Sequence, residues 1–309
     1  MSVVINTNVA SLIAQNNLST NTAAYQKAME QISSGLKINS ASDDAAGLSI
    51  SESIKTQING NKKALSNIQT GGNVLAIAEG GQITVTTHLQ RIRELCVQAA
   101  NETYKASDKT NNMQEIKQRL ADINNIASST TFNGVPLLDR VYDTAGNPVV
   151  GGTKSLSLQI GANSNAAVNA LDIGPALSDV HVTALGNLTP AQNGGLADNT
   201  GIELAASVDG TTWTTAAIRT YMNKIDTAIN TISSNRALLG AYGNRLQATS
   251  SNVTVMNTNL TDANSRIMDA DIAESSSSMI KFQILQRTSA SILSQANQLP
   301  SLALSLLGQ

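Results

Sequence analysis

Apolar residues repeat with heptad spacing at both ends of the chain, and this repeat constrains the fold more than any other feature. Steps of four and three residues near the start define one stripe, whose members include Leu18, Tyr25, Met29, Ile32 and Leu36. A second stripe near the end includes Phe282, Leu285, Ile292, Leu299 and Leu306. Such stripes are typical of helices that pack lengthwise against other helices. We therefore expect a mainly α-helical fold in which both chain ends form a long coiled-coil-like bundle.

A longer pattern of the same kind runs from Ile54 to Ala99. It predicts one long helix over about residues 44–102, with a soft point at Gly80 and Gly81, where the phase of the pattern shifts. At a rise of 1.5 Å per residue such a helix is roughly 85 Å long. A helix of that length needs partner helices along its course.

Two further helices and their breaks are expected from the sequence. The stripe within residues 109–130 predicts a shorter helix that is followed by a turn at Asn133 and Gly134. Residues 246–270 keep the heptad spacing without a slip, and a break follows over 269–275. The stretch from Gly35 to Asn39 similarly ends the first helix.

The middle of the chain differs in composition from the ends. From about residue 135 to 215, Gly, Asn, Asp and Thr are frequent and the apolar runs are short. The segment "SLSLQIGAN" at 155–163 alternates apolar and polar residues, which predicts a strand. Residues 176–217, with the only tryptophan, Trp213, predict a short surface-exposed insertion. The helical bundle should therefore carry a small β element and a short insertion in its middle.

The composition argues against several classes of protein. Aromatic residues make up only 3% of the 309 residues while hydrophobic residues reach 41%, which suits helix–helix contacts better than a core built around rings. The net charge of −2, without a basic block, makes nucleic acid and membrane surfaces poor partners. No apolar run approaches the ~20 residues that span a bilayer. Residues 1–20 lack the pattern of a cleaved signal peptide, so we expect a soluble chain whose export, if any, needs none.

The chemistry-bearing residues do not form an enzyme motif. His88 and His181 stand in no metal-ligand spacing, and we interpret both as solvated or partly packed side chains. Cys96, the only cysteine, falls on the stripe with Leu89 and Ile92, which predicts a buried, unreactive thiol. We expect no enzyme activity, no cofactor and no metal site.

The stretch "NSASDDAAGLSIS" at 39–51 contains the one suggestive acidic pair, Asp43 and Asp44. Paired carboxylates can bind a hard cation or share a proton, but such a site needs ligands from elsewhere. The alternative is that Ser42, Asp43 and Asp44 cap the long helix, because side-chain oxygens accept hydrogen bonds from its free backbone N–H groups. We favour capping, since it needs only the local sequence.

Several long motifs in order resemble those of the bacterial flagellins. They begin with "VINTNVASLIAQNNLS", "SSGLKINSASDDAAGLSIS", "LQRIRELCVQAAN" and "FNGVPLLD", and resume with "NRALLGAYGNRL", "NVTVMNTNLTDANSRIMDADIAE" and "QILQRTSASILSQANQLPSLALSLL". The resemblance covers about residues 1–140 and 218–309. Cys96 departs from the family, which usually has alanine at this position.

The resemblance implies an extracellular subunit of the flagellar filament, secreted by the flagellar type III route and assembling with copies of itself into a helical polymer. The stripes at the two chain ends then form the assembly seam. The implied segments are 1–43, the terminal helix and linker of an inner core domain; 44–175, a helical part with β-hairpins; 176–217, the variable insertion; 218–269, a long helix; and 270–309, the second linker and terminal helix.

Further partners are implied by the same resemblance. They are an export chaperone at the C-terminal helix, the filament cap and the hook–filament junction proteins. Ser42, Asp43 and Asp44 would also make polar contacts with a neighbouring subunit. Toll-like receptor 5 of an animal host would bind the free subunit, and the positions that match its contact motif, with their near neighbours, are Gln90, Arg91, Leu95, Gln98, Glu115 and Arg119. Because Arg91 and Leu95 lie four residues apart and off the Leu89–Cys96 stripe, we expect them to share one exposed face.

Two alternatives stay open at this stage. A hook–filament junction protein shares the terminal helices, although the intact "LQRIREL" and "SILSQANQLPSLALSLL" motifs favour the filament subunit. A secreted hydrolase could reside in the insertion, but the sequence has no H-E-x-x-H motif.

Overall fold

The computed structural model describes residues 7–139, 141–142, 148–149, 156–182, 184–185, 202 and 213–307. Side chains are described within these ranges except at 141–142, 148–149 and 299–307. Most of the expected insertion, including 186–201 and 203–212, therefore lies outside the described residues.

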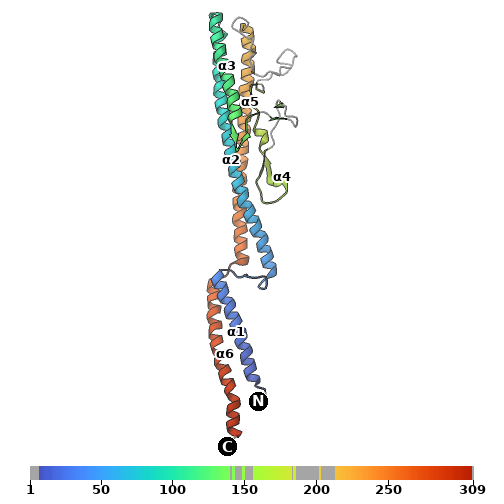
Figure 1. Cartoon of the computed structure of the whole chain (residues 1–309), viewed down its shortest axis with the longest axis vertical. Helices are drawn as coiled ribbons and strands as arrows, with labels where there is room; N and C mark the ends of the chain where they lie inside the picture. The colour runs from blue at the N-terminus through green and yellow to red at the C-terminus, as the bar shows by residue number, and fades with distance from the viewer. Residues whose placement is uncertain are drawn as a thin grey trace. The chain divides into compact units, whose positions relative to one another are not determined.

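The described residues are mainly helical, which confirms the expected fold class. The long helices are α1 (Val9–Ser34), α2 (Ala45–Ala99), α3 (Ala106–Ser129), α5 (Thr215–Met268) and α6 (Ile272–Leu307), and α4 (Ala166–Asn169) is short (Figure 1). α1 begins after Asn8, whose side chain accepts a hydrogen bond from the Ser11 N–H at 3.0 Å. It ends at Gly35, whose φ of +71° suits a residue without a Cβ.

Short antiparallel hairpins follow α3. β1 (Thr131–Phe132) pairs with β2 (Val135–Pro136), β3 (Val141–Tyr142) with β4 (Pro148–Val149), and β5 (Ser157–Gln159) with β6 (Ala170–Asp172). The predicted turn at Asn133 and Gly134 joins β1 to β2, and both residues have the positive φ of a tight hairpin turn. The strand expected within 155–163 is β5, and a single 3₁₀ turn, Gly174–Ala176, follows β6.

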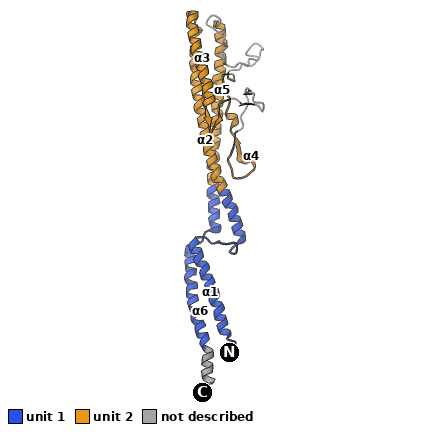
Figure 2. Cartoon of the chain, viewed as in Figure 1, with its two compact units in different colours: residues 1–58, 257–309 blue, residues 59–256 orange. Residues whose placement is uncertain are grey.

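The chain forms two compact units, which Figure 2 colours separately. Unit 1 comprises residues 1–58 and 257–309, and unit 2 comprises residues 59–256. Our expected segments instead change at the linkers near residues 43 and 270, between helices.

Unit 2 has one continuous apolar core. Parts of α2 and α5 lie beside α3, as Figure 1 shows, and their fully buried side chains join a single cluster that includes Leu89, Ile92, Ile116, Ile123, Ile218 and Ile225. Burial of this kind of area at roughly 25 cal/mol per Å² is the main stabilising contribution to such a bundle. Unit 2 therefore buries its largest apolar side chains without help from another chain.

Glycines on α2 let the following segment approach closely. A Cβ on Gly60 would lie 2.7 Å from the Cβ of Ala162, and one on Gly71 would meet the side chain of Leu158. At Gly81 a Cβ would lie 2.6 Å from Leu138 Cδ1. α2 is continuous through Gly80 and Gly81, so the glycines at the expected soft point do not break the helix. Gly81 provides room for a packed neighbour instead.

The expectation of a surface-exposed insertion is wrong for several of its described residues. Val180, Val182, Ile202 and Trp213 are all nearly fully buried and belong to the core cluster. The Trp213 ring meets that of Tyr221 edge-on, with centroids 6.2 Å apart. The reason is that these isolated apolar residues, set among turn-forming ones, fill the space beside α5.

We predict that Ile116→Ala lowers the free energy of unfolding of unit 2 by about 2–5 kcal/mol, because it leaves a cavity in a fully buried site. Urea unfolding followed by far-UV circular dichroism measures the change. The control is Ile83→Ala, since Ile83 on α2 is 45% exposed and alanine favours helix. Equal losses for the two variants would contradict the assigned core.

Candidate functional site

α1 and α6 contact each other mainly through small and polar side chains. The buried residues are Ala14 and Ala28 on α1 and Ser275, Ser289 and Ala296 on α6. The helices are also joined by hydrogen bonds from Asn21 to Ser289 Oγ at 3.0 Å and from Gln286 to Thr22 Oγ1 at 3.1 Å. The contact between these two helices therefore buries few large apolar side chains.

Large apolar side chains remain exposed on the same two helices. They are Val9, Leu12, Ile13 and Met29 on α1 and Ile272, Ile280, Ile284, Leu285 and Ile292 on α6. At 100° per residue, Ile280 and Ile284 lie roughly 140° or more around α6 from the buried Ser289. Exposed apolar side chains that gather on a surface often mark a contact with another protein. We call these exposed residues the apolar faces of α1 and α6.

The predicted seam divides between the two environments. Leu18, Tyr25, Ile32, Leu36 and Phe282 are half-buried, whereas Met29, Leu285 and Ile292 are exposed. Leu299 and Leu306 are helical, but their side chains lie outside the described residues. The sequence pattern emphasised these large residues and gave no special weight to the small ones, such as Ala14 and Ala28, at which the helices touch.

The two linkers of unit 1 are tied together by backbone hydrogen bonds. The Lys37 N–H donates to the Met268 carbonyl at 2.6 Å, and the Ala270 N–H donates to the Gly35 carbonyl at 3.0 Å. These bonds flank an isolated antiparallel bridge at Leu36. The loop that ends α1 is thereby fixed to the loop that ends α5.

Asp43 anchors the linker between α1 and α2. Its carboxylate lies 2.7 Å from the Lys27 ammonium and accepts hydrogen bonds from the N–H groups of Asn39 at 3.2 Å and Ser40 at 3.1 Å. The Lys27 contact, followed by the backbone N–H groups of Ser40 and Asn39, lowers the pKa of Asp43 to about 2. Asp43 therefore stays ionised and closes the loop.

Asp44 is the member of the predicted trio that caps α2. Its Oδ1 accepts a hydrogen bond from the Gly47 N–H at 2.9 Å, the position of an N-cap. Ser42 does not cap the helix, since its hydroxyl bonds to that of Ser40 at 2.7 Å. Asp43 does not cap it either, because its oxygens face the preceding loop and Lys27. The sequence placed the cap within two residues of its position.

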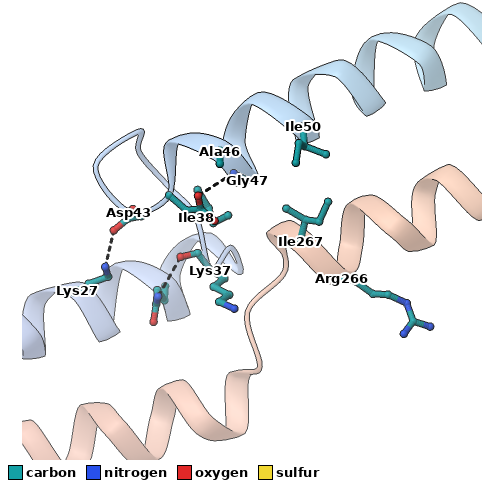
Figure 3. A pocket seen from close by; sticks show the side chains of 11 residues that line it. Lys27, Lys37, Ile38, Asp43, Ala46, Gly47, Ile50, Arg266 and Ile267 are labelled. Carbon is teal, nitrogen blue, oxygen red and sulfur yellow. Dashed lines mark hydrogen bonds and ion pairs between the residues drawn. The ribbon is translucent and has the colours of Figure 1, made fainter.

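The linkers border a hollow in unit 1 with a volume of about 550 Å³ (Figure 3). Its apolar lining includes Ile38, Ile50 and Ile267, and Lys27, Lys37, Asp43 and Asp44 add charge. Ile50 is 53% exposed, so part of this lining is open to solvent. Within the described ranges, no three His, Cys, Asp or Glu side chains are grouped closely enough to hold a metal ion.

A network of charges joins α2 to α3 in unit 2. Arg91 lies 3.2 Å from Glu115 and 3.0 Å from Glu94, and Arg119 lies 3.0 Å from Glu115. Glu94 and Glu115 raise the pKa of Arg91, and Arg119 and Arg91 lower the pKa of Glu115. These side chains are partly or well exposed, so the network forms a charged surface.

The other predicted receptor positions differ in exposure. Gln90 and Gln98 are exposed, and Gln98 donates to the Tyr104 hydroxyl at 3.3 Å. Leu95 is only 2% exposed, so its expected place on an exposed face with Arg91 is wrong. The reason is that α2 packs against two helices and buries a wider arc than one stripe. Leu95 lies roughly 60° around the helix from Ile92 and roughly 40° from Arg91, which pairs with Glu115 on α3.

The remaining candidate residues are placed by packing. Cys96 is fully buried, and burial raises its pKa to about 12, so the thiol is unreactive as predicted. Ser128, Asp139 and His181 lie together, but Asp139 at 2.7 Å and Ser128 at 3.5 Å both face His181 Nε2. A nucleophilic triad needs its serine and its acid on opposite ring nitrogens.

The other histidine of the sequence, His88, is half-buried on α2.

Comparisons with known proteins match both ends of the chain. Residues 5–143 match the bacterial flagellin N-terminal helical region, and residues 222–307 match the bacterial flagellin C-terminal helical region. A flagellin of Bacillus subtilis is 40% identical, in an alignment that covers 98% of this chain and 99% of the relative. The chain belongs to the bacterial flagellin family. This flagellin is therefore a structural, non-enzymatic subunit of the flagellar filament.

Other relatives agree with this assignment. The flagellar filament 33 kDa core protein of Treponema phagedenis is 38% identical, covering 99% of this flagellin and 100% of the relative. A putative flagellar hook-associated protein of Vibrio parahaemolyticus has a similar structure, with a TM-score of 0.56 over 74% of this flagellin and 100% of that chain. At 15% identity this likeness shows the fold alone. Among the described residues, no helix of this flagellin combines the length and hydropathy needed to cross a membrane.

We predict that the Asp43 carboxyl titrates well below its ordinary value of 3.8, with a midpoint near 2. Because the folded-state pKa is lowered, the stabilisation by Asp43 is fully present above pH 3.8 and is lost as the pH falls through about 2. An NMR titration of the Asp43 carboxyl carbon measures the midpoint.

The matched variants for this titration are two lysines of the same hollow. Lys27→Met should raise the midpoint toward 3.8, since Lys27 is the largest cause of the shift. Lys37→Met should leave it unchanged, because no ion pair joins Lys37 to Asp43 among the described contacts. An unchanged midpoint in Lys27→Met would refute the assigned ion pair.

Proposed function

We propose that this flagellin polymerises by burying the apolar faces of α1 and α6 against neighbouring subunits. One observation carries the proposal: the two helices meet through residues such as Ala14 and Ser289, while Ile13, Ile284 and similar side chains remain exposed. Burial of each such side chain contributes roughly 1.5–3 kcal/mol, and the contacts repeat at every subunit. Apolar residues on more than one side of α6 call for more than one neighbour, as in an open helical polymer.

The proposal extends to export and to the accessory proteins of the filament. The subunit leaves the cell by the flagellar type III route, unfolded and without a cleaved signal, and becomes extracellular. An export chaperone covers the C-terminal helix before assembly, and the filament cap and junction proteins meet the terminal helices afterwards. The exposed apolar side chains of α6 support this, because such a surface promotes premature association unless it is covered.

The linker supplies a second contact to a neighbour in this proposal. Ser42 and Asp44 are exposed beside the hollow, and Asp43 is half-buried against Lys27. The polar groups of this loop lie next to the exposed Ile50, as at the rim of an ordinary protein interface. The loop would thus combine an internal role, holding α1 to α2, with a contact between subunits.

The free subunit is also proposed to bind Toll-like receptor 5 through the charged surface around Arg91. The exposed or partly exposed positions Gln90, Arg91, Gln98, Glu115 and Arg119 support this surface. The burial of Leu95 argues that this residue supports the surface from beneath rather than touching the receptor. Arginine is enriched among the residues that dominate binding energy at protein interfaces.

We predict that Ile284→Asp prevents seeded polymerisation, because it places a charge on the apolar face of α6. Val168→Asp is the control, since Val168 on α4 is even more exposed, at 73%, but lies on neither terminal helix. Light scattering and electron microscopy of the seeded samples give the readout. Removal of residues 275–309 should likewise abolish assembly, and efficient polymerisation of the shortened chain would contradict the proposal.

For the receptor surface we predict that Arg91→Ala weakens activation of Toll-like receptor 5 by about tenfold or more, the loss expected of a central interface residue. Arg93→Ala is the matched control. Arg93 has nearly the same exposed fraction, 46% against 45%, but it pairs with Asp226 on α5 at 2.6 Å. A reporter-cell assay with monomeric protein measures activation. Equal losses in both variants would place the receptor contact elsewhere.

A further inference from the structure

Gln82 lies on the buried side of α2 in unit 2 and is 0% exposed. Among the described residues, neither its amide nitrogen nor its amide oxygen has a hydrogen-bond partner. A buried amide without partners is destabilising, and a hydrophobic side chain of similar size would avoid this cost. Gln82 is also flanked along α2 by Ala78 and Val85, which are fully buried apolar residues. The amide therefore interrupts the apolar run between Ala78 and Val85.

A second interruption lies on α5. Asn235 is 8% exposed, and its amide nitrogen has no partner within the described part of the chain. Its neighbours on the buried stripe, Ile232 and Leu239, are apolar. Each of the two helices thus carries a buried amide between apolar layers.

The two amides lie at the same level of the bundle. Gly71 on α2 lies next to Leu246 on α5. Further along α2, Glu79 pairs with Arg236. Further still, Arg93 pairs with Asp226. The helices are therefore antiparallel here. Gln82, one turn beyond Glu79, lies opposite Asn235 to within about one helical turn.

We propose that Gln82 and Asn235 form a buried polar layer that fixes the register of α2 against α5. Valine, isoleucine, leucine and alanine at heptad spacing discriminate weakly between registers, because a slip of one heptad again places apolar residues opposite apolar residues. Such a slip would bring Asn235 to the level of Leu75 or Leu89, both of which are buried. It would leave Gln82 opposite Ala228, which offers only hydrocarbon to the amide, or opposite Tyr242, which offers a single hydroxyl in place of an amide.

The observed register is the one that keeps the two amides in a common layer, where rotation of either side chain can let one satisfy the other. Slipped registers separate them and leave both in apolar surroundings. The layer therefore destabilises the slipped registers more than it stabilises the native one. Single buried asparagines have the same effect in coiled coils. The ion pairs Glu79–Arg236 and Arg93–Asp226 are at least a third exposed, and such pairs contribute less to the choice of register.

The test replaces the layer by apolar side chains in the full chain, kept monomeric. The variant is Gln82→Met with Asn235→Leu, and Val85→Leu is the control that changes an adjacent apolar layer. Spin labels are attached at Thr84→Cys and Gln247→Cys, two exposed positions on α2 and α5. The buried thiol of Cys96 remains unlabelled.

The expected result has two parts. The thermal midpoint of the variant should rise by about 2–4 °C, because the buried polar atoms of Gln82 and Asn235 that lack partners are removed. Electron–electron distance measurements should show a second population, since a slip of one heptad changes the axial separation of the labels by roughly 10 Å. The parent and Val85→Leu should each show a single population.

Three results would overturn the proposal. A single distance population in the apolar-layer variant, equal to that of the parent, would mean that other contacts set the register. A second population in Val85→Leu as well would show that any change of packing loosens the bundle. A lower thermal midpoint in the variant would show that the amides stabilise the native core.

Discussion

The rest of the structure depends on the way α1 and α6 touch. Alanine and serine allow the two helices to approach closely, so the contact itself buries little apolar area. Several larger residues, such as Ile13 and Ile284, remain exposed on the pair. In the proposed assembly these exposed residues contribute free energy when neighbouring subunits cover them.

The linkers connect the pair of α1 and α6 to the rest of unit 1. Gly35 turns the chain at the end of α1, and bonds from Lys37 and Ala270 hold the two loops together. The Lys27–Asp43 ion pair then closes the loop before α2. Unit 2 differs, because many large apolar side chains among its described residues are buried within the one chain. Stability is thus distributed unevenly, with the self-sufficient part separate from the part that awaits neighbours.

The sequence predicts the helices well because their apolar spacing extends over many turns, and the turn at Asn133 is predicted because its residues favour positive φ. Contacts between segments far apart in the sequence are harder to predict. The spacing around Leu89 indicated one stripe, whereas α2 meets both α3 and α5, so Leu95 was expected on the surface. Asp43 looked like a cap because its partner, Lys27, lies on another helix. Trp213 was assigned to an exposed insertion, since the surrounding composition outweighed one apolar ring.

The placement of Trp213 has a practical consequence for experiments that follow the folding and polymerisation of this protein. As the only tryptophan, packed against Tyr221 in unit 2, it is an intrinsic fluorophore that reports on one region alone. Its emission should shift to the red when the unit 2 bundle unfolds, because the indole then meets water. α1 and α6 contain no tryptophan, so their contacts with neighbouring subunits add no such signal. Folding of the bundle and growth of the polymer can therefore be timed separately in one unlabelled sample, by emission and by scattered light.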